Sequence, residues 1–413
     1  MKLGCYFPYS LITFDVPKNT VTWCCKQTKG NSLSSFTPTD YFDDPVLKDI
    51  RTSLTKGVKH ELCSFCWEVE KSGIQSWRQT NGSIPDHLTK INLDTPPYNK
   101  IVKRLEIKLD NTCDLACIYC GPWESTSWQR ENKKSNFYDY PTPVIDDGLQ
   151  QKIIDTVLEI GKFNDDLEIG FVGGESFLSK HIKQAAFKKY IDAFYTHASL
   201  SAALTLKFVS NANTPDKILN QTIKILEQSK LQYPRLQVNV ALSFESTGVF
   251  TETSRYLSSW DQINKNVNKW LSKSWANITI NTAFNALTLS DLPNFVDYLI
   301  NIHQKYNRKI SITSDIVYYP QGLTPSVLPN TFATYIDAAL VKVSEHMFTD
   351  DVDCGYEKFI NALNTIKDTL GTTTNQHTLS LTRYVTYCIE VRKIDIQKIS
   401  PELYSFVFKG NTL

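Results

Sequence analysis

Three cysteines in one short stretch are the residues best suited to chemistry in this chain. The stretch NTCDLACIYC, residues 111–120, spaces Cys113, Cys117 and Cys120 as C-x3-C-x2-C. Thiolates are soft ligands that suit zinc or iron–sulfur clusters. A structural zinc site closes with four protein ligands, whereas a site with three leaves a position for an exchangeable group. The spacing therefore predicts a metal centre with an open position, and a zinc site or a chance match is the alternative.

The other cysteines gather near the N-terminus. Five of the ten cysteines lie in the first 66 residues, namely Cys5, Cys24, Cys25, Cys63 and Cys66. One residue of the adjacent pair, with the other three, could form a four-thiolate site holding zinc or an iron–sulfur cluster. We favour Cys24 over Cys25, since neighbouring residues of an extended strand point to opposite faces. Cys354 and Cys388 are isolated and are expected to be buried thiols.

The elements that position these cysteines alternate between strand and helix. Period-two and helical patterns predict strands at 104–110, 167–174, 204–213, 236–245, 278–284 and 310–320, and helices at 146–163, 182–198, 216–230, 260–273, 292–307 and 328–347. This alternation favours a parallel α/β architecture, as a partial barrel or an open sheet of six units. Chemistry in either belongs at the carboxyl ends of the strands, and the three-cysteine motif follows the first of them.

The two ends of the chain read differently from this core. Residues 1–85 contain short strand-like pieces and a helix at 45–57, and 80–100 resembles a linker. The tail from about residue 348 is predicted to be helical. We therefore expect a cysteine-rich module at 1–85, a core domain at 100–330 and a helical C-terminal extension at 331–413.

Composition limits the partners and the compartment. The net charge of +1 supplies no basic field for a nucleic acid, and the start of the chain does not resemble a signal peptide. No run reaches the 18 apolar residues of a membrane span. A cytoplasmic protein is expected, in which clustered cysteines bind metal rather than form disulfides.

The stretch CDLACIYC, including Tyr119 before its last cysteine, resembles the cluster loop of the radical S-adenosylmethionine (SAM) enzymes. The resemblance implies a partial (βα)6 TIM-like barrel whose [4Fe–4S] cluster is held by Cys113, Cys117 and Cys120. In that family the open iron binds SAM, which is cleaved reductively to a 5′-deoxyadenosyl radical that abstracts hydrogen from the substrate. It also implies an electron donor such as flavodoxin or ferredoxin. No catalytic residue beyond the cluster ligands is implied.

Further motifs at predicted strand ends resemble the SAM-binding segments of the same family. They are FVGGES, FVSNAN, LSFEST and TETSRY, and the SAM-binding residues that they imply are Gly173, Gly174, Glu175, Asn211, Ser243, Glu245 and Arg255. One of them departs from the family pattern, because the frequent Thr-Asn-Gly turn reads Ser210-Asn211-Ala212 here.

The N-terminal module resembles the SPASM/twitch modules that bind an auxiliary [4Fe–4S] cluster. The similar features are CYFP at the start, a short hairpin ending in cysteine, a helix and CSFCW, which imply Cys5, Cys24, Cys63 and Cys66 as ligands. The module precedes the barrel here, an order shared by twitch-type radical SAM proteins common in phage genomes, which would place a phage protein in the host cytoplasm. The tail, with Arg392 and 401–403, is also similar.

The substrate is the least constrained part of the prediction. The resemblance favours a peptide or protein substrate, because SPASM/twitch relatives often modify these. A nucleotide or sugar is the alternative within enzyme chemistry. A second class is a non-enzymatic iron–sulfur or zinc protein that binds a partner or senses redox state.

Overall fold

The computed structural model describes residues 5–24, 27, 30–37, 43–71, 76–80, 102–140, 148–179, 187–346 and 355–409. The chain folds into two compact units, of which the first comprises Met1–Asn111, Pro143–Phe208 and Gln221–Val238, and the second Thr112–Thr142, Val209–Asn220 and Asn239–Leu413. Each unit combines separate stretches of the chain. The division therefore does not test the predicted boundaries 1–85, 100–330 and 331–413, which stay predictions.

The first unit contains a mostly parallel set of strands. They are β1 (Leu11–Asp15), β2 (Thr20–Thr22), β3 (Asn31–Ser32), β4 (Arg104–Lys108), β6 (Asp166–Phe171) and β7 (Ala203–Ser210), of which β7 ends in the second unit. Their order is β7-β6-β4-β1-β2-β3. The pairs β1–β4, β4–β6 and β6–β7 are parallel, whereas β2 is antiparallel to β1 and β3. The N-terminal strand β1 thus extends the set formed by the core strands.

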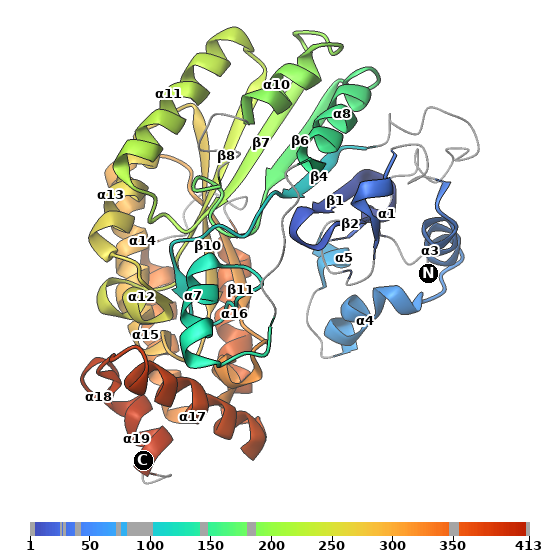
Figure 1. Cartoon of the computed structure of the whole chain (residues 1–413). Coiled ribbons are helices and arrows are strands. Elements are labelled where there is room, and N and C mark those ends of the chain that lie inside the picture. The colour runs from blue at the N-terminus through green and yellow to red at the C-terminus, as the bar shows by residue number, and fades with distance from the viewer. Residues whose placement is uncertain are drawn as a thin grey trace. The chain divides into compact units, whose positions relative to one another are not determined.

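Helices accompany these strands. They are α1 (Phe7–Ser10), α3 (Pro45–Thr55), α4 (Ser64–Lys71), α5 (Trp77–Thr80), α8 (Leu149–Gly161), α10 (Phe187–Tyr195) and α11 (Asp216–Gln232), and α11 begins in the second unit. Helices α8 and α10 lie side by side over the strands (Figure 1). Every second residue of β7 is buried, and the ring of Phe208 stacks on Phe171 at 5.3 Å between centroids. The period-two pattern of the sequence therefore builds the core of this unit.

The second unit contains the strands β5 (Ala116–Cys117), β8 (Leu236–Ser243), β9 (Arg255–Tyr256), β10 (Ala276–Phe284) and β11 (Ser311–Ile316), the first residues of β8 lying in the first unit. The order of the longer strands is β8-β10-β11, and β10 and β11 are parallel. Strands β5 and β9 form a separate antiparallel pair. This small pair contains one of the motif cysteines, Cys117.

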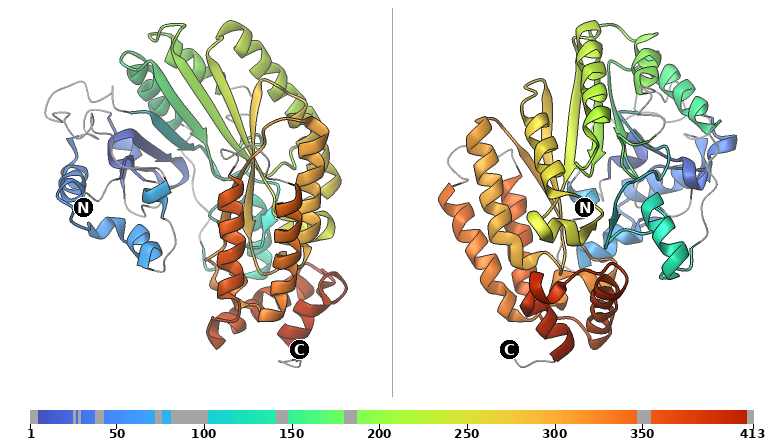
Figure 2. Two further views of the ribbon diagram at one scale, coloured as in Figure 1. Left: turned by 180° about the vertical axis from the view of Figure 1, so that it is seen from behind. Right: turned by 60° about the vertical axis from the view of Figure 1, so that its left-hand side comes forward.

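The helices of the second unit are α7 (Thr126–Ser135), α12 (Gly248–Ser254), α13 (Trp260–Leu271), α14 (Leu292–Tyr306), α15 (Ala333–His346), α16 (Tyr356–Thr369), α17 (Asn375–Glu390), α18 (Ile396–Ile399) and α19 (Pro401–Lys409). Helix α15 contacts α14 and α16, and α16 packs on β11 (Figure 2). The last helices, α17 to α19, contact one another at the C-terminal end of the chain. None of the described helices is both long enough and apolar enough to cross a membrane.

The predicted mixed α/β class and the six strand–helix units are confirmed, with bounds that shift by a few residues. The first residues of two predicted helices, 146–147 and 182–186, lie outside the described residues. Helices α1, α4, α5, α7 and α12 were not predicted. In α7 the buried side chains include Ser127 and Asn132, so no apolar stripe marks this helix in the sequence. Residues 81–100 of the predicted linker lie outside the described residues. Closure of the strands into a partial barrel stays a prediction.

Candidate metal centre

The three-cysteine motif lies in the second unit, on a loop at residues 112–125 that we call the cysteine loop. This loop follows β4 in the chain and leads into α7. Its strand β5 pairs with β9, with Cys117 opposite Arg255. The backbone N–H of Ile118 donates to the carbonyl of Ser254 at 2.7 Å. The middle of the loop is therefore held by a short ladder on a segment far away in the sequence.

Side chains at the N-cap and in the first turn of α7 also hold the backbone of the cysteine loop. The hydroxyl of Ser125 donates to the carbonyl of Leu115 at 2.5 Å, and that of Ser127 donates to the carbonyl of Cys113 at 2.8 Å. The indole N–H of Trp128 donates to the carbonyl of Cys117 at 2.6 Å. Buried carbonyls need such partners, so an irregular loop is stabilised here by side-chain donors.

Polar residues that follow β7 contact the first motif cysteine. The side-chain N–H of Asn211 donates to Oδ1 of Asp114 at 2.8 Å and approaches Sγ of Cys113 at 3.8 Å. The side chain of Asn213 donates to the other oxygen of Asp114 at 2.8 Å. The backbone between the two asparagines turns through Ala212, which has a φ of 60°. This left-handed conformation costs an alanine about 1–2 kcal/mol, and glycine would adopt it freely.

A buried ion pair after β8 contacts the last part of the cysteine loop. The carboxylate of Glu245 accepts two N–H bonds from Arg255, at 3.0 and 2.7 Å, and the hydroxyl of Tyr119 at 3.1 Å. The exposed fractions of the two charged side chains are 0% and 6%. Burial alone would lower the pKa of Arg255, but the Glu245 carboxylate outweighs it and holds the pKa above its usual value. The Arg255 guanidinium also lies over the ring of Tyr119, 5.6 Å from its centroid.

The three motif thiols differ in their exposure. Cys113 and Cys117 are buried, each with 9% of its surface exposed, and Cys120 is half-buried beside them. Burial raises the pKa of Cys117 to about 11, and the positive charge of Arg255 acts in the opposite direction. Thiols with a raised pKa stay protonated near neutral pH, so a metal would displace the proton on binding.

The donor set fits an iron–sulfur cluster with one open iron. Three thiols on one loop can bind three corners of a cubane cluster. Among the described residues, no three or more His, Cys, Asp or Glu side chains converge in a way that could hold a single ion. The ligands of a cubane bind separate irons and need not meet at one point, unlike the ligands of one zinc ion.

The Gly-Gly-Glu motif forms a turn after β6, in the first unit. Gly173 and Gly174 have φ values of 79° and 55°, a region that favours glycine. A methyl group on Gly173 would lie 2.5 Å from Cγ of Lys108, so the turn also needs the missing side chain. Glu175 is fully buried, and its carboxylate accepts the backbone N–H of Phe177 at 3.1 Å.

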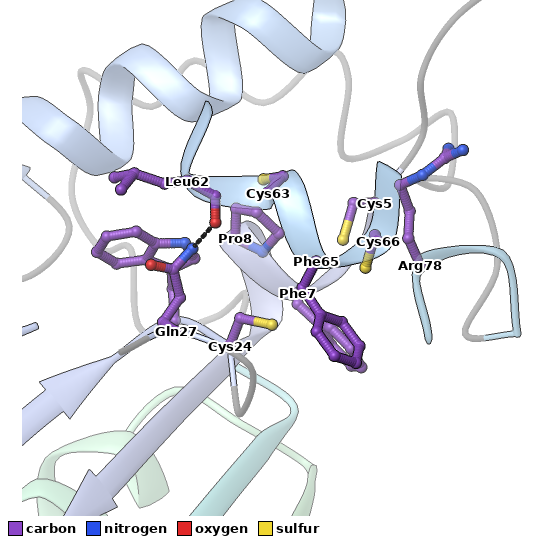
Figure 3. Close-up of a pocket in the computed structure, with 11 residues that line it drawn as sticks. Cys5, Phe7, Pro8, Cys24, Gln27, Leu62, Cys63, Phe65, Cys66 and Arg78 are labelled. Atoms are coloured by element: carbon purple, nitrogen blue, oxygen red, sulfur yellow. Dashed lines mark hydrogen bonds between the residues drawn. The ribbon is translucent and has the colours of Figure 1, made fainter. Parts of the chain in front are cut away.

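A second group of thiols lines one pocket of the first unit (Figure 3). The four cysteines are those implied by the module resemblance, Cys5, Cys24, Cys63 and Cys66. Figure 3 shows Cys24 reaching the pocket from the segment after β2, while Cys63 and Cys66 come from the start of α4 and the turn before it. Cys25, the alternative to Cys24, lies outside the described residues, as does Cys354.

A positive charge accompanies this thiol pocket. Arg78 lines the pocket, pairs with Glu70 at 2.7 Å and lies over the ring of Trp67 at 4.7 Å. Burial raises the pKa of Cys5 to about 12 and that of Cys63 to about 11, while the charge of Arg78 acts to lower both. A guanidinium held here favours thiolate ligands over neutral thiols.

The structure thus brings several predicted residues together within each unit. In the second unit, Asn211 lies against the first cysteine, and Glu245 and Arg255 lie against Tyr119. Ser243, at the end of β8, accepts a hydrogen bond from Asn281, and among the described residues it makes no hydrogen bond to the cysteine loop. In the first unit, the predicted four-cysteine set lines one pocket. Their roles as ligands stay predictions.

Sequence reasoning missed several residues that hold the site. Asp114 lies inside the motif and accepts hydrogen bonds from two asparagines, although no role was predicted for it. Asn213 belongs to the quoted stretch FVSNAN, so a search for amides at strand ends could have found it. Trp128 and the hydroxyls of α7 gave no signal, because nothing in their spacing marks them as partners of the loop carbonyls.

No family model matches the chain, and neither does any of the curated proteins. Among solved structures, the chain is similar to native anSMEcpe with bound AdoMet, at 16% identity over 62% of this chain and 61% of that chain, with a TM-score of 0.39. It is also similar to native anSMEcpe with bound AdoMet and Cp18Cys peptide, at 17% identity over 65% of this chain and 62% of that one, with a TM-score of 0.39. This chain thus spans about three fifths of the length of those structures, and a likeness at this level carries no argument about the function.

Proposed function

We propose that this chain is a radical SAM enzyme in which Cys113, Cys117 and Cys120 hold a [4Fe–4S] cluster. The observation that carries the proposal is the setting of the cysteine loop. Its three thiols lie on a loop that is contacted by polar residues within two positions of the ends of β7 and β8, namely Asn211 and Glu245. Carboxyl ends of parallel strands are where α/β folds place their chemistry.

The residues of the chain have distinct tasks under this proposal. The three thiolates would bind three irons, and the cluster with SAM would supply hydrogen-atom abstraction from the substrate. Asn211 offers an N–H to Cys113, which suits a sulfur that carries negative charge. Leu115 and Ile118 are fully buried in the loop and exclude water from its inner side.

The remaining SAM-binding residues are proposed on the motif resemblance. They are Gly173, Gly174, Glu175, Asn211, Ser243, Glu245 and Arg255. The ion pair with Glu245 uses two of the five N–H donors of Arg255, so the guanidinium has further capacity for a carboxylate such as that of SAM. The same ion pair also holds Tyr119, the residue before Cys120, because Glu245 accepts the hydrogen bond of the Tyr119 hydroxyl.

We propose that the pocket lined by Cys5, Cys24, Cys63 and Cys66 holds an auxiliary [4Fe–4S] cluster. Four thiolates complete such a site without an open position, and the nearby Arg78 supports their ionised form. A zinc ion bound by the same four thiols is the alternative. Iron and zinc analysis of the purified chain distinguishes these two occupants.

For the substrate we propose a peptide or protein, on the resemblance to SPASM/twitch modules, with a nucleotide or sugar as the alternative. A low-potential donor such as flavodoxin or ferredoxin would supply the electron. Incubation of the reduced enzyme with SAM and candidate peptides, followed by mass spectrometry, tests the substrate class directly.

Anaerobic purification and reconstitution test the proposed function. We expect about eight irons per chain, four for each of two clusters, and release of 5′-deoxyadenosine from SAM on reduction. The variant Cys113→Ala should lose cleavage and about half of the iron. The matched control Cys388→Ala removes a buried thiol outside both groups and should retain both properties. A colourless wild-type chain that holds only zinc, or SAM that survives reduction intact, would refute the proposal.

A further inference from the structure

Arg392, just after the C-terminal end of α17, is buried against the cysteine loop although 276 residues separate it from Ala116. Its Nη2 donates to the carbonyl of Ala116, in β5, at 2.7 Å. Its Nε donates to Glu131 of α7 at 2.8 Å. The side chain is fully buried, with 0% of its surface exposed. One guanidinium therefore joins the last helices of the second unit to the loop and to the helix that follows the loop.

Aromatic rings enclose this guanidinium. Its central carbon lies 4.7 Å from the ring centroid of Trp128, 4.6 Å from that of Tyr256 and 5.3 Å from that of Tyr387. Trp128 itself binds the carbonyl of Cys117, and Tyr256 pairs with Ala116 in the β5–β9 ladder. Cation–π attraction is stronger for a desolvated guanidinium than for an exposed one. Arg392 is thus packed between the two segments that hold the middle of the loop.

One nitrogen of this guanidinium, Nη1, still has hydrogen-bonding capacity, and we call it the reserve donor. Nη1 of Arg392 is buried and has no hydrogen-bond partner among the described residues. A buried donor without a partner is costly, so a hydrogen bond from Nη1 is favourable wherever an acceptor comes within reach. The charge of Arg392 acts on the Cys117 thiol, where it opposes the effect of burial on the pKa.

We propose that Arg392 is the positioning residue of the cysteine loop, fixing the Ala116 carbonyl and donating its Nη1 N–H to the loaded loop. The first part concerns the chain without metal. The second part rests on the proposed function, because it requires a cluster on the loop. A hydrogen bond to cluster sulfur raises the reduction potential, so the two parts have separate readouts.

The first part is tested by amide hydrogen exchange of the metal-free chain. The variant Arg392→Gln should speed exchange of the Ile118 and Cys120 amides at least tenfold, while the amides of β10 and β11 keep their wild-type rates. The matched control is Arg383→Gln, since Arg383 also lies on α17, over the ring of Phe137, and donates to a backbone carbonyl away from the loop. It should leave the loop amides unchanged. Loop exchange within twofold of wild type in Arg392→Gln would overturn the first part.

A conservative variant covers the case in which Arg392→Gln fails to fold. Lysine keeps the charge but cannot present a planar fork to Ala116 and Glu131 together. Arg392→Lys should therefore fold, and its loop amides should exchange faster than those of wild type. Where Arg392→Gln also folds, the exchange rates of the lysine variant should lie between those of wild type and those of Arg392→Gln. Exchange equal to that of wild type in the lysine variant would overturn the positioning role.

The second part is tested on the reconstituted protein. The potential of the loop cluster, measured by redox titration with electron paramagnetic resonance, should become more negative in Arg392→Gln and stay unchanged in Arg383→Gln. An unchanged potential in Arg392→Gln would overturn the reserve donor alone. A wild-type chain that takes up no iron would overturn the reserve donor together with the proposed function, and the exchange result would still decide the first part.

Discussion

The turn after β7 allows a quantitative test, because its residue Ala212 has a left-handed backbone conformation that glycine adopts more easily. Ala212 has a φ of 60° and is 2% exposed. Its N–H donates to the hydroxyl of Ser210 at 3.1 Å, and its carbonyl accepts from Asn266 at 2.8 Å. These two backbone bonds hold the turn and do not involve the methyl group. The substitution Ala212→Gly therefore changes the conformational cost while leaving the hydrogen bonds intact.

Three effects, not all of the same sign, determine how much Ala212→Gly changes the free energy of unfolding. Relief of the left-handed conformation stabilises the folded state by about 1–2 kcal/mol. Glycine loses more backbone entropy on folding, which costs about 0.4–1 kcal/mol, and loss of the buried methyl costs about 0.8 kcal/mol. We therefore expect Ala212→Gly to change the free energy of unfolding by less than about 1 kcal/mol in either direction.

The matched control is Ala339→Gly, at a fully buried alanine inside α15 of the same unit. Glycine in a helix interior costs about 1 kcal/mol, and the lost methyl adds about 0.8 kcal/mol, so this variant should be destabilised by about 2 kcal/mol. Urea unfolding followed by tryptophan fluorescence compares both variants on the transition of one unit. If Ala212→Gly proves as destabilising as Ala339→Gly, the turn has no left-handed residue at 212 and the reasoning is wrong.

Other residues give further expectations. Gly173→Ala adds a methyl group into an occupied space at positive φ, whereas the methyl group of Gly248→Ala meets nothing within 4 Å. Gly248→Ala should therefore cost about 1–2 kcal/mol for its backbone conformation alone, and Gly173→Ala should cost more. Thermal unfolding compares the two variants, and equal losses of stability would contradict the crowding at Gly173. Glu245→Ala leaves the buried Arg255 charge unpaired and should cost about 3–5 kcal/mol in urea unfolding, whereas a loss below about 1 kcal/mol would show that the pair is not buried. Because burial raises the pKa of Cys117 to about 11, its alkylation by iodoacetamide in the metal-free chain should be about a hundredfold slower at pH 8 than for a free cysteine, and should rise about tenfold per pH unit. Mass spectrometry of the modified peptide follows this rate, and reaction as fast as that of free cysteine would refute the shift.

The strands and helices could be predicted because their signal is local. Strand β7 buries every second residue, and helix α13 begins after Ser259, whose hydroxyl accepts the N–H of Gln262. Such patterns depend only on residues close together in the sequence, so they can be recognised without knowledge of the fold. Helix α7 has no apolar stripe, since Trp128 is the one large apolar side chain that it buries, and the pattern failed there.

The contacts of the site could be predicted only in part. The cysteines, Glu245 and Arg255 were identified because motifs mark them, yet their mutual arrangement was not foreseen. The sequence suggested that Arg255 faces a ligand, whereas the structure shows its guanidinium bound to Glu245. A pairing of this kind depends on how β9 lies against β5, a non-local contact that no spacing in the sequence records.

The hydrogen bonds of its backbone connect the irregular shape of the cysteine loop to its chemistry. The short β5–β9 pair is the regular backbone pairing of this loop among the described residues, so its other backbone groups need other partners. Its carbonyls at 113, 115, 116 and 117 instead accept bonds from the side chains of Ser127, Ser125, Arg392 and Trp128. Each of these donors lies outside the motif, at the N-cap of α7, on α7 or after α17. The spacing of the cysteines therefore supplies the ligands, while the shape of the loop depends on donors that the motif does not contain. A C-x3-C-x2-C stretch transplanted without them should bind a cluster less well, because the loop would have to be ordered by the metal alone.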